Sequence, residues 1–321
     1  MISGENQHFT LVRCESDDDW LVERRKGIGG SDVAAIMGLS AYSTPYQVWL
    51  EKTRGIHEDI SDKPAVMWGN ILEPVVGEHY MDCHPDRHVR RVNAIARSIQ
   101  RPWAQASLDY EVHDPELGWG VLEIKTAGWR REQDWEDGVP VYYQTQVAHY
   151  LSVTGRPFAD VAVLIAGQDY REFRVMRDEE DVATVNAAVD EFWHEFVEKG
   201  EAPEVEAFDA HSLFMAHQRD DGEYLSGDDR NLGAIVNLWL TAKSDMDEAR
   251  MRMDHYATAL KDAIGDSRGL DFPAGRLTWQ RSERKRLDSK RLRSERPDIA
   301  DEYTTSSMAD GGLRWKPRKE K

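Results

Sequence analysis

Two stretches near the middle of the chain alternate apolar and polar side chains with a period of two. They are residues 104–112 and 120–126, and residues 113–118 between them (HDPELG) have turn chemistry. The alternation predicts a β-hairpin in a chain whose other periodic segments are mostly helical.

Helical spacing of apolar residues surrounds this hairpin. It predicts helices over residues 20–26, 31–37, 46–52, 65–80, 142–153 and 179–199. A continuous apolar run over 160–166 predicts a buried strand, with 171–175 as its partner. The expected fold is α/β, a mixed sheet flanked by helices, with a mainly helical C-terminal module.

Composition shifts divide the chain. We expect a polar N-terminal segment over 1–19, an α/β domain over 20–203, an acidic linker over 204–229 and a helical module over 230–321 with a small hairpin at 270–280. Apolar residues recur at heptad spacing from 232 to 264, and this predicted helix is interpreted as an arm, an oligomer contact or a docking site.

Charge and cysteine content exclude several classes of protein. A formal net charge of −18 excludes a chain that coats nucleic acid or an anionic membrane as a polycation. Two cysteines are too few for a disulfide framework, an iron–sulfur cluster or a Cys-rich zinc site. No apolar run approaches the roughly 20 residues that span a bilayer, so we expect a cytoplasmic protein without a membrane partner.

Charged residues interrupt the predicted hairpin. Asp109 lies toward the end of its first strand, and Glu123 and Lys125 share one face of the second. The two carboxylates and the Ile124 carbonyl are oxygen ligands suited to a hard divalent cation. With Lys125 to orient or deprotonate a water, this combination suits phosphodiester hydrolysis. The alternative is a solvated, salt-bridged strand face.

Two further residues fit the same chemistry. Glu73, in the predicted helix 65–80, is a third carboxylate for a site with two ions about 4 Å apart. Gln146, in the helix after the hairpin, can bond the water or a ligand of the metal, and Gln144 competes for that role.

Five motifs in one order resemble a known family. They are RKGIGGSD at 25–32, WGNILEP at 68–74, SLD at 107–109, LEIKT at 122–126 and YYQTQ at 142–146. The sequence resembles the YqaJ-type viral recombinase family, which is related to bacteriophage lambda exonuclease within the PD-(D/E)XK nuclease superfamily. The resemblance implies a restriction-endonuclease-like core over 20–203.

The resemblance also implies an activity. It is Mg²⁺-dependent digestion of linear double-stranded DNA from the 5′ end, with Mn²⁺ as a substitute and two ions per site. The 3′ strand exposed in this way would serve recombination through a single-strand annealing protein. A ring-shaped homo-oligomer, a phage or prophage origin and the bacterial host cytoplasm are implied as well.

Residue roles follow motif by motif. Glu73, Asp109 and Glu123 match metal ligands, Lys125 the catalytic lysine and Gln146 the motif glutamine. Arg25 and Ser31 match the residues that hold the terminal 5′ phosphate. A forked guanidinium and the N–H groups at the start of a helix suit that anion, although a plain turn and helix cap would look alike.

Basic residues gather at the C-terminal end, where residues 281–321 hold 13 Lys or Arg against 8 Asp or Glu. The candidate contacts to DNA phosphates are Arg284, Lys285, Arg286, Lys290 and Arg291, with a solvated charged helix as the alternative. Trp119 and Trp129 could stack on bases or pack under the hairpin. The scattered histidines at 79, 84 and 88 lack the spacing of a zinc motif.

Two rival functions remain at this stage. The same fold can act as an endonuclease, restriction-like or structure-specific, and a closed circular duplex would separate the two activities. The other rival is an inactive DNA-binding or partner-docking protein, although all of the expected catalytic residues are present.

Overall fold

The structure is a computed structural model that describes residues 8–92, 94–217, 222–228 and 232–317. It divides into two compact units, 1–218 and 219–321, which are described separately. The first unit has seven α-helices among these residues: α1 (Asp17–Arg24), α2 (Gly30–Ile36), α3 (Pro45–Arg54), α4 (Pro64–Cys83), α5 (Val141–Thr154), α6 (Glu179–Phe192) and α7 (Ala210–Ala216). Shorter turns of helix are η1 (Trp129–Trp135), η2 (Trp193–Val197) and η3 (Ala207–Asp209).

Eight strands of the first unit form two sheets. The five-stranded sheet has the order β2-β5-β6-β7-β8 and the three-stranded sheet the order β1-β3-β4. Their bounds are β1 (Phe9–Val12), β2 (His88–Arg91), β3 (Ile95–Ser98), β4 (Gln105–Ser107), β5 (Tyr110–Asp114), β6 (Gly118–Ala127), β7 (Phe158–Ile165) and β8 (Asp169–Met176). In the larger sheet only β6 and β7 are parallel, so the sheet is mixed.

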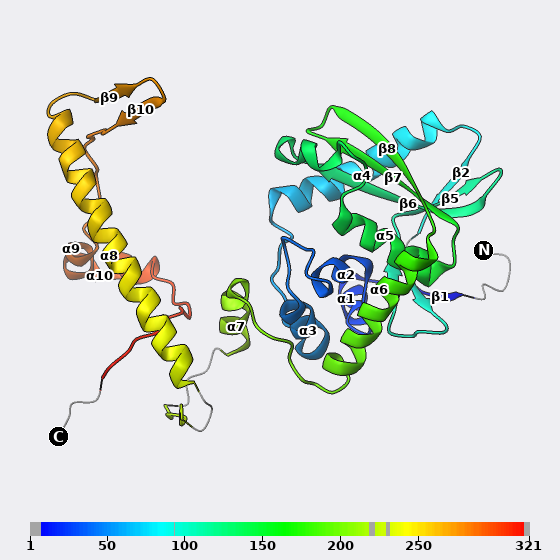
Figure 1. Ribbon diagram of the computed structural model, residues 1–321, viewed down its shortest axis with the longest axis horizontal. Coiled ribbons are helices and arrows are strands. Elements are labelled where there is room, and N and C mark those ends of the chain that lie inside the picture. Colours follow the sequence, from blue (N-terminus) through cyan, green and yellow to red (C-terminus); the bar gives the residue numbers. More distant parts are fainter. Residues whose placement is uncertain (1–7, 93, 218–221, 229–231, 318–321) are drawn as a thin grey trace. The chain divides into compact units, whose positions relative to one another are not determined.

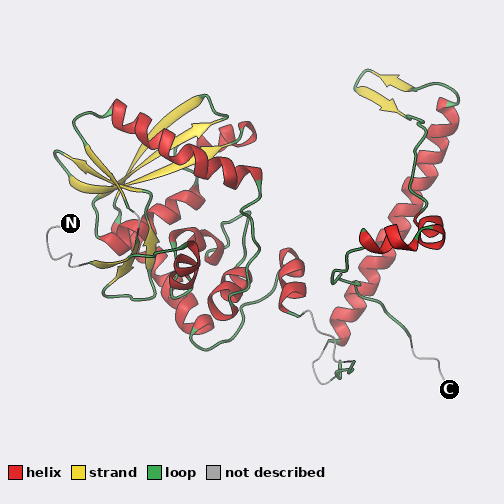
Figure 2. Ribbon diagram, turned by 180° about the vertical axis from the view of Figure 1, so that it is seen from behind, coloured by secondary structure: helices red, strands yellow, loops and turns green. Residues whose placement is uncertain are grey.

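Helices cover both faces of the larger sheet (Figures 1 and 2). On one face, Val76 and Tyr80 of α4 pack with Leu122 and Ile124 of β6. On the other face, α5 packs with alternate residues of β6 and β7, such as Val161. The five-stranded mixed sheet flanked by helices is the predicted α/β core.

The predicted hairpin is present, but its first strand is divided. Residues 104–112 form β4 and β5 in different sheets, with Leu108 and Asp109 between them, and β5 alone pairs with β6. The Asp109 carboxylate accepts a hydrogen bond of 2.9 Å from the backbone N–H of Ile124. A side chain therefore takes the place of a ladder bond where the chain leaves one sheet for the other.

The segment predicted as an acidic linker contains η3 and α7. Asp209 is buried there, and the Thr44 hydroxyl donates a hydrogen bond of 2.5 Å to its carboxylate. Leu213 of α7 packs against the cluster of apolar residues around Trp49. Residues 206–216 are thus tied to the first unit.

The second unit consists of a long helix, a small hairpin and two short helices. They are α8 (Gly233–Ile264), β9 (Gly269–Phe272), β10 (Gly275–Thr278), α9 (Ser289–Glu295) and α10 (Pro297–Glu302). The predicted long helix and hairpin are both present. On α8 the heptad positions Met246, Met253 and Leu260 are exposed. No helix in the described ranges combines the length and the apolar character that a bilayer crossing requires.

Candidate active site

Asp109, Glu123, Lys125 and Gln146 meet where β5 and β6 lie beside α5. Glu123 and Lys125 project from the same face of β6, and the Lys125 ammonium donates to Glu123 Oε1. The Gln146 amide donates to the same oxygen at 2.8 Å. The alternation of β6 and the packing of α5 beside the sheet thus bring together four residues that the sequence separates by up to 37 positions.

The other oxygen of Glu123 has no partner in the structure. The side chain of Glu123 is buried, and its Oε2 atom makes no hydrogen bond. Buried polar atoms are nearly always paired, so an unpartnered carboxylate oxygen indicates a missing ligand. A cation is the ligand that this donor set suits, because carboxylate oxygens bind hard divalent ions.

The electrostatics of the cluster lead to the same expectation. Burial raises the pKa of Asp109 well above its usual value, and the charge of Glu123 adds to the shift. Burial also raises the pKa of Glu123. The pKa of Lys125 is raised, because the neighbouring carboxylates Glu123 and Asp109 outweigh the opposing effect of burial. The lysine is therefore charged, and burial disfavours the charged form of both carboxylates, a cost that a bound cation would offset.

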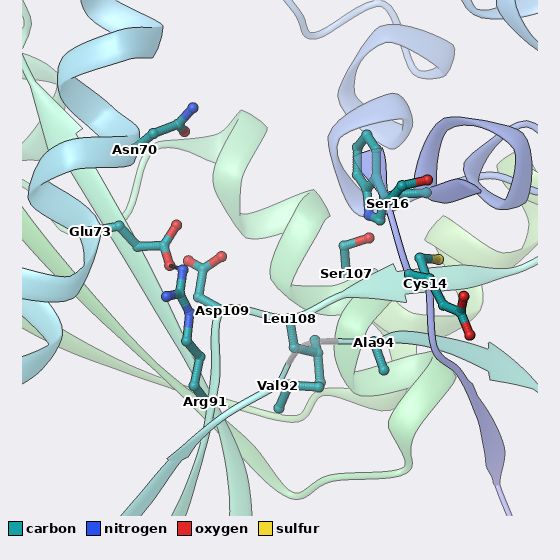
Figure 3. A pocket seen from close by; sticks show the side chains of 12 residues that line it. Cys14, Ser16, Asn70, Glu73, Arg91, Val92, Ala94, Ser107, Leu108 and Asp109 are labelled. Atoms are coloured by element: carbon teal, nitrogen blue, oxygen red, sulfur yellow. Dashed lines mark hydrogen bonds and ion pairs between the residues drawn. The ribbon is translucent and has the colours of Figure 1, made fainter. Parts of the chain in front are cut away.

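Glu73 comes from α4 and lies at the edge of this cluster. Its negative charge raises the pKa of both Asp109 and Glu123. Its Oε1 atom is 2.9 Å from a guanidinium nitrogen of Arg91. With Asp109 and Arg91 it lines a cavity of about 550 Å³ (Figure 3). Within the described parts of the chain, no three His, Cys, Asp or Glu side chains are grouped closely enough to hold one metal ion. Glu73 thus lies near the predicted site, where its carboxylate pairs with Arg91.

The structure distinguishes between the two candidate glutamines. Gln144 donates to the carbonyl of Val139 at 2.6 Å and makes no bond in the cluster. Gln146 bonds Glu123, and it also donates to the Tyr150 hydroxyl at 2.7 Å. Gln146 is the glutamine that the fold places in the site.

The structure separates the two predicted phosphate residues, Arg25 and Ser31. Arg24, rather than Arg25, lies beside Ser31, with 3.4 Å between its guanidinium and the hydroxyl. Arg25 packs instead against Gly55, where a Cβ atom would come within 2.7 Å of its guanidinium. The two arginines are adjacent at the end of α1, so their side chains point in different directions, and sequence alone did not distinguish them.

A buried ion-pair network holds the start of α2. Asp32 is 2.8 Å from both the Arg24 guanidinium and the Lys52 ammonium. These cations outweigh the effect of burial and lower the pKa of Asp32 to about 2. At the same end of the helix, a Cβ atom on Gly30 would lie 2.9 Å from Gln146 Cγ. The first turn of α2 therefore adjoins the carboxylate cluster.

The remaining candidates lie elsewhere. Trp119 packs under Arg90, 4.0 Å from ring centre to guanidinium, whereas Trp129 is 69% exposed. His84 pairs with Glu172 and does not reach the cluster. The candidate DNA-binding residues of the second unit are exposed in the segment after β10 and in α9: Arg284, Lys285, Arg286, Lys290 and Arg291.

Comparison with known proteins identifies relatives. The sequence model of the YqaJ-like viral recombinase domain matches residues 19–157. The uncharacterized protein YqaJ of Bacillus subtilis strain 168 is 29% identical over 289 residues, which are 88% of this chain and 89% of YqaJ. Protein D345L of African swine fever virus is 33% identical over 72 residues, 21% of each protein.

Solved structures with a similar chain trace include two exonucleases. The alkaline exonuclease LHK-Exo of Laribacter hongkongensis is 22% identical and has a TM-score of 0.47, with 57% of this chain and 94% of that chain covered. A phage related exonuclease of Haemophilus somnus 129PT is 11% identical and has a TM-score of 0.39, with 54% and 96% covered.

Proposed function

Since residues 19–157 belong to the YqaJ-like viral recombinase domain family, we propose that this chain is a metal-dependent nuclease that digests linear double-stranded DNA from its 5′ ends. The observation that carries the proposal is the buried, unpartnered Oε2 atom of Glu123 beside Asp109 and Lys125. In a plain salt-bridged strand face, a buried carboxylate oxygen is nearly always paired.

Two carboxylates and one carbonyl form the proposed metal site. Asp109 and Glu123 would hold the ion, with the carbonyl of Ile124 as a further ligand and Glu73 as the third carboxylate. When bound, Mg²⁺ or Mn²⁺, with two ions per site, would polarise the phosphate and lower the pKa of water.

Lys125 acts in this proposal as a fixed positive charge. Its raised pKa keeps the ammonium protonated, so it stabilises negative charge on the phosphate oxygens more readily than it removes a proton from water. Gln146 restrains the Glu123 carboxylate through its amide, and Tyr150 accepts the second hydrogen bond from that amide. Both residues therefore orient the acid that would face the metal.

The proposed 5′ phosphate site lies at the start of α2. Ser31 is exposed there and Arg24 reaches its hydroxyl, so we propose Arg24 for this role beside the predicted Arg25. A guanidinium and the backbone N–H groups at the start of a helix are both suited to a terminal phosphate.

The wider setting is part of the same proposal. The product would be a duplex with 3′ single strands, passed to a single-strand annealing protein in the cytoplasm of a bacterial host, within phage-type recombination. A ring-shaped homo-oligomer would keep the enzyme on its substrate. The C-terminal basic residues would contact phosphates without reading bases.

A plasmid that exists in linear and covalently closed forms tests the activity. The proposal predicts that Mg²⁺ or Mn²⁺ supports loss of the linear form, that EDTA abolishes it and that the closed circle stays intact. Cleavage of the circle would identify an endonuclease with the same fold. Binding of both forms without any cleavage would indicate the inactive docking protein.

A further inference from the structure

Arg91 is the last residue of β2, and its backbone lies beside the candidate active site. It stands opposite Tyr110 in the pairing of β2 with β5. The N–H of the next residue, Val92, donates to the carbonyl of Asp109 at 3.1 Å. The sheet therefore fixes Arg91 next to one of the proposed metal ligands, although no sequence motif marks it.

The side chain of Arg91 extends into the cavity that Glu73 and Asp109 line (Figure 3). It is the only basic side chain among the described residues that line this cavity. Its Nη2 atom is 2.9 Å from Glu73 Oε1, and the side chains are 52% and 24% exposed respectively. An arginine carries five N–H donors, so one such bond leaves donors for another anion.

The neighbouring arginine shows what a purely structural role looks like in this strand. Arg90 points to the opposite side of β2, where two of its nitrogens bond the buried Glu111 at 3.0 and 2.7 Å. Its guanidinium also covers the ring of Trp119. Arg91 has neither a buried partner of this kind nor a ring to cover it.

We propose that Arg91 is a phosphate-binding residue. Its guanidinium pairs with Glu73 in the absence of a divalent cation and with a phosphate of the DNA once a divalent cation binds. This inference rests on the nuclease proposed above. The cation and Arg91 compete for the same carboxylate, and Glu73 and the phosphate compete for the same guanidinium. Binding of the cation releases Arg91 toward the DNA, and linkage requires that DNA in turn favours the cation.

Two titrations of the full-length protein test the exchange. One adds Ca²⁺ as the probe cation, and the other adds a fluorescent 5′-phosphorylated duplex in Ca²⁺. The length of the duplex is checked afterwards to show that it was not cleaved. In Arg91→Ala, Ca²⁺ affinity measured by calorimetry should rise about two- to fivefold, because an exposed ion pair no longer holds Glu73. Duplex affinity in Ca²⁺, measured by anisotropy, should fall about tenfold. Its logarithmic salt dependence should become shallower by about 1.

The double variant identifies the route of the effect. In a Glu73→Gln background, Arg91→Ala should no longer raise the affinity for Ca²⁺. The single variant Arg91→Lys should retain part of the affinity for the duplex. Loss of both affinities in Arg91→Ala would mean that Arg91 merely orders Glu73, and unchanged duplex affinity would mean that no phosphate binds it. Either result overturns the exchange alone. A wild type that binds neither Ca²⁺ nor duplex refutes the nuclease proposal and this one together.

Discussion

Single side chains decide the chemistry of the carboxylate cluster, and Gln146 gives the clearest test of their arrangement. Its amide bonds the oxygen of Glu123 that Lys125 also contacts. In Gln146→Ala, we expect the cleavage rate to fall roughly tenfold, because one hydrogen bond that orients the acid is lost. Gln144→Ala is the matched control and should stay within about twofold of wild type, since Gln144 bonds Val139 instead. Equal losses in the two variants would contradict the assignment.

His149 provides a prediction about stability at residue scale. It is fully buried in α5, its Nε2 atom lies 2.9 Å from the carbonyl oxygen of Gln105, and burial lowers its pKa to about 4. In the unfolded chain a histidine has a pKa of about 6.5. Between pH 4 and pH 6.5, the unfolded state therefore binds a proton that the folded state does not bind. The free energy of unfolding should therefore decrease as pH falls through this window, by about 2 kcal/mol from this residue between pH 7 and pH 5.

Urea unfolding at pH 7 and pH 5 measures this contribution. Other titrating groups affect wild type and His149→Gln alike, so the difference between the two pH dependences isolates the histidine. The variant should lose less stability on acidification than wild type. The same loss in both proteins would show that the pKa of His149 in the folded protein is not lowered.

At the scale of elements, the close approach of α2 to α5 sets the position of the proposed phosphate site relative to the carboxylates. A Cβ atom on Gly30 would lie 2.5 Å from the ring of Tyr150 and 2.9 Å from Gln146. Gly30→Ala should therefore cost about 1–3 kcal/mol of stability, despite the better helix propensity of alanine. Gly128→Ala is the control, because a Cβ atom there meets nothing within 4 Å. Thermal unfolding of the two variants compares them, and a stable Gly30→Ala protein would refute the close packing.

Much of the architecture could be predicted from period alone. The helices at 65–80 and 142–153 and the buried strand at 160–166 correspond to α4, α5 and β7. The division of the first hairpin strand could not be predicted, because it depends on the bond of Asp109 to Ile124 across the sheet. The strands β1, β2 and β3 are four residues each, too short for alternation to indicate them.

In the site, too, some residues could be placed from the sequence and others only from the folded structure. Motif spacing placed Asp109, Glu123, Lys125 and Gln146 together because each pair is related by strand pairing or by one helix packed on the sheet. The proposed roles of Arg24 and Arg91 depend on which way an arginine side chain turns once the chain is folded. A one-residue choice between Arg24 and Arg25 lies beyond what the periodicity of the short helix α1 resolves.

For the whole molecule, the contrast of charge is the principal feature. The chain carries −18 in total, yet the residues after β10 are rich in arginine and lysine. If this segment contacts DNA, replacing Arg284, Lys285, Arg286, Lys290 and Arg291 by alanine should make the logarithmic salt dependence of duplex binding shallower by up to about 4 or 5. The melting temperature should not change, because all five side chains are exposed. An unchanged salt dependence would favour a solvated charged segment.

The central claim is that this chain removes nucleotides from the 5′ ends of duplex DNA at the cluster around Glu123. The measurement that tests it most directly is the release of label from linear duplexes labelled at either the 5′ or the 3′ end, in Mg²⁺, by wild type and Lys125→Ala. We predict early release of the 5′ label by wild type and a rate about 10²- to 10³-fold lower in the variant. Early release of the 3′ label, or equal rates for the two proteins, would contradict the account.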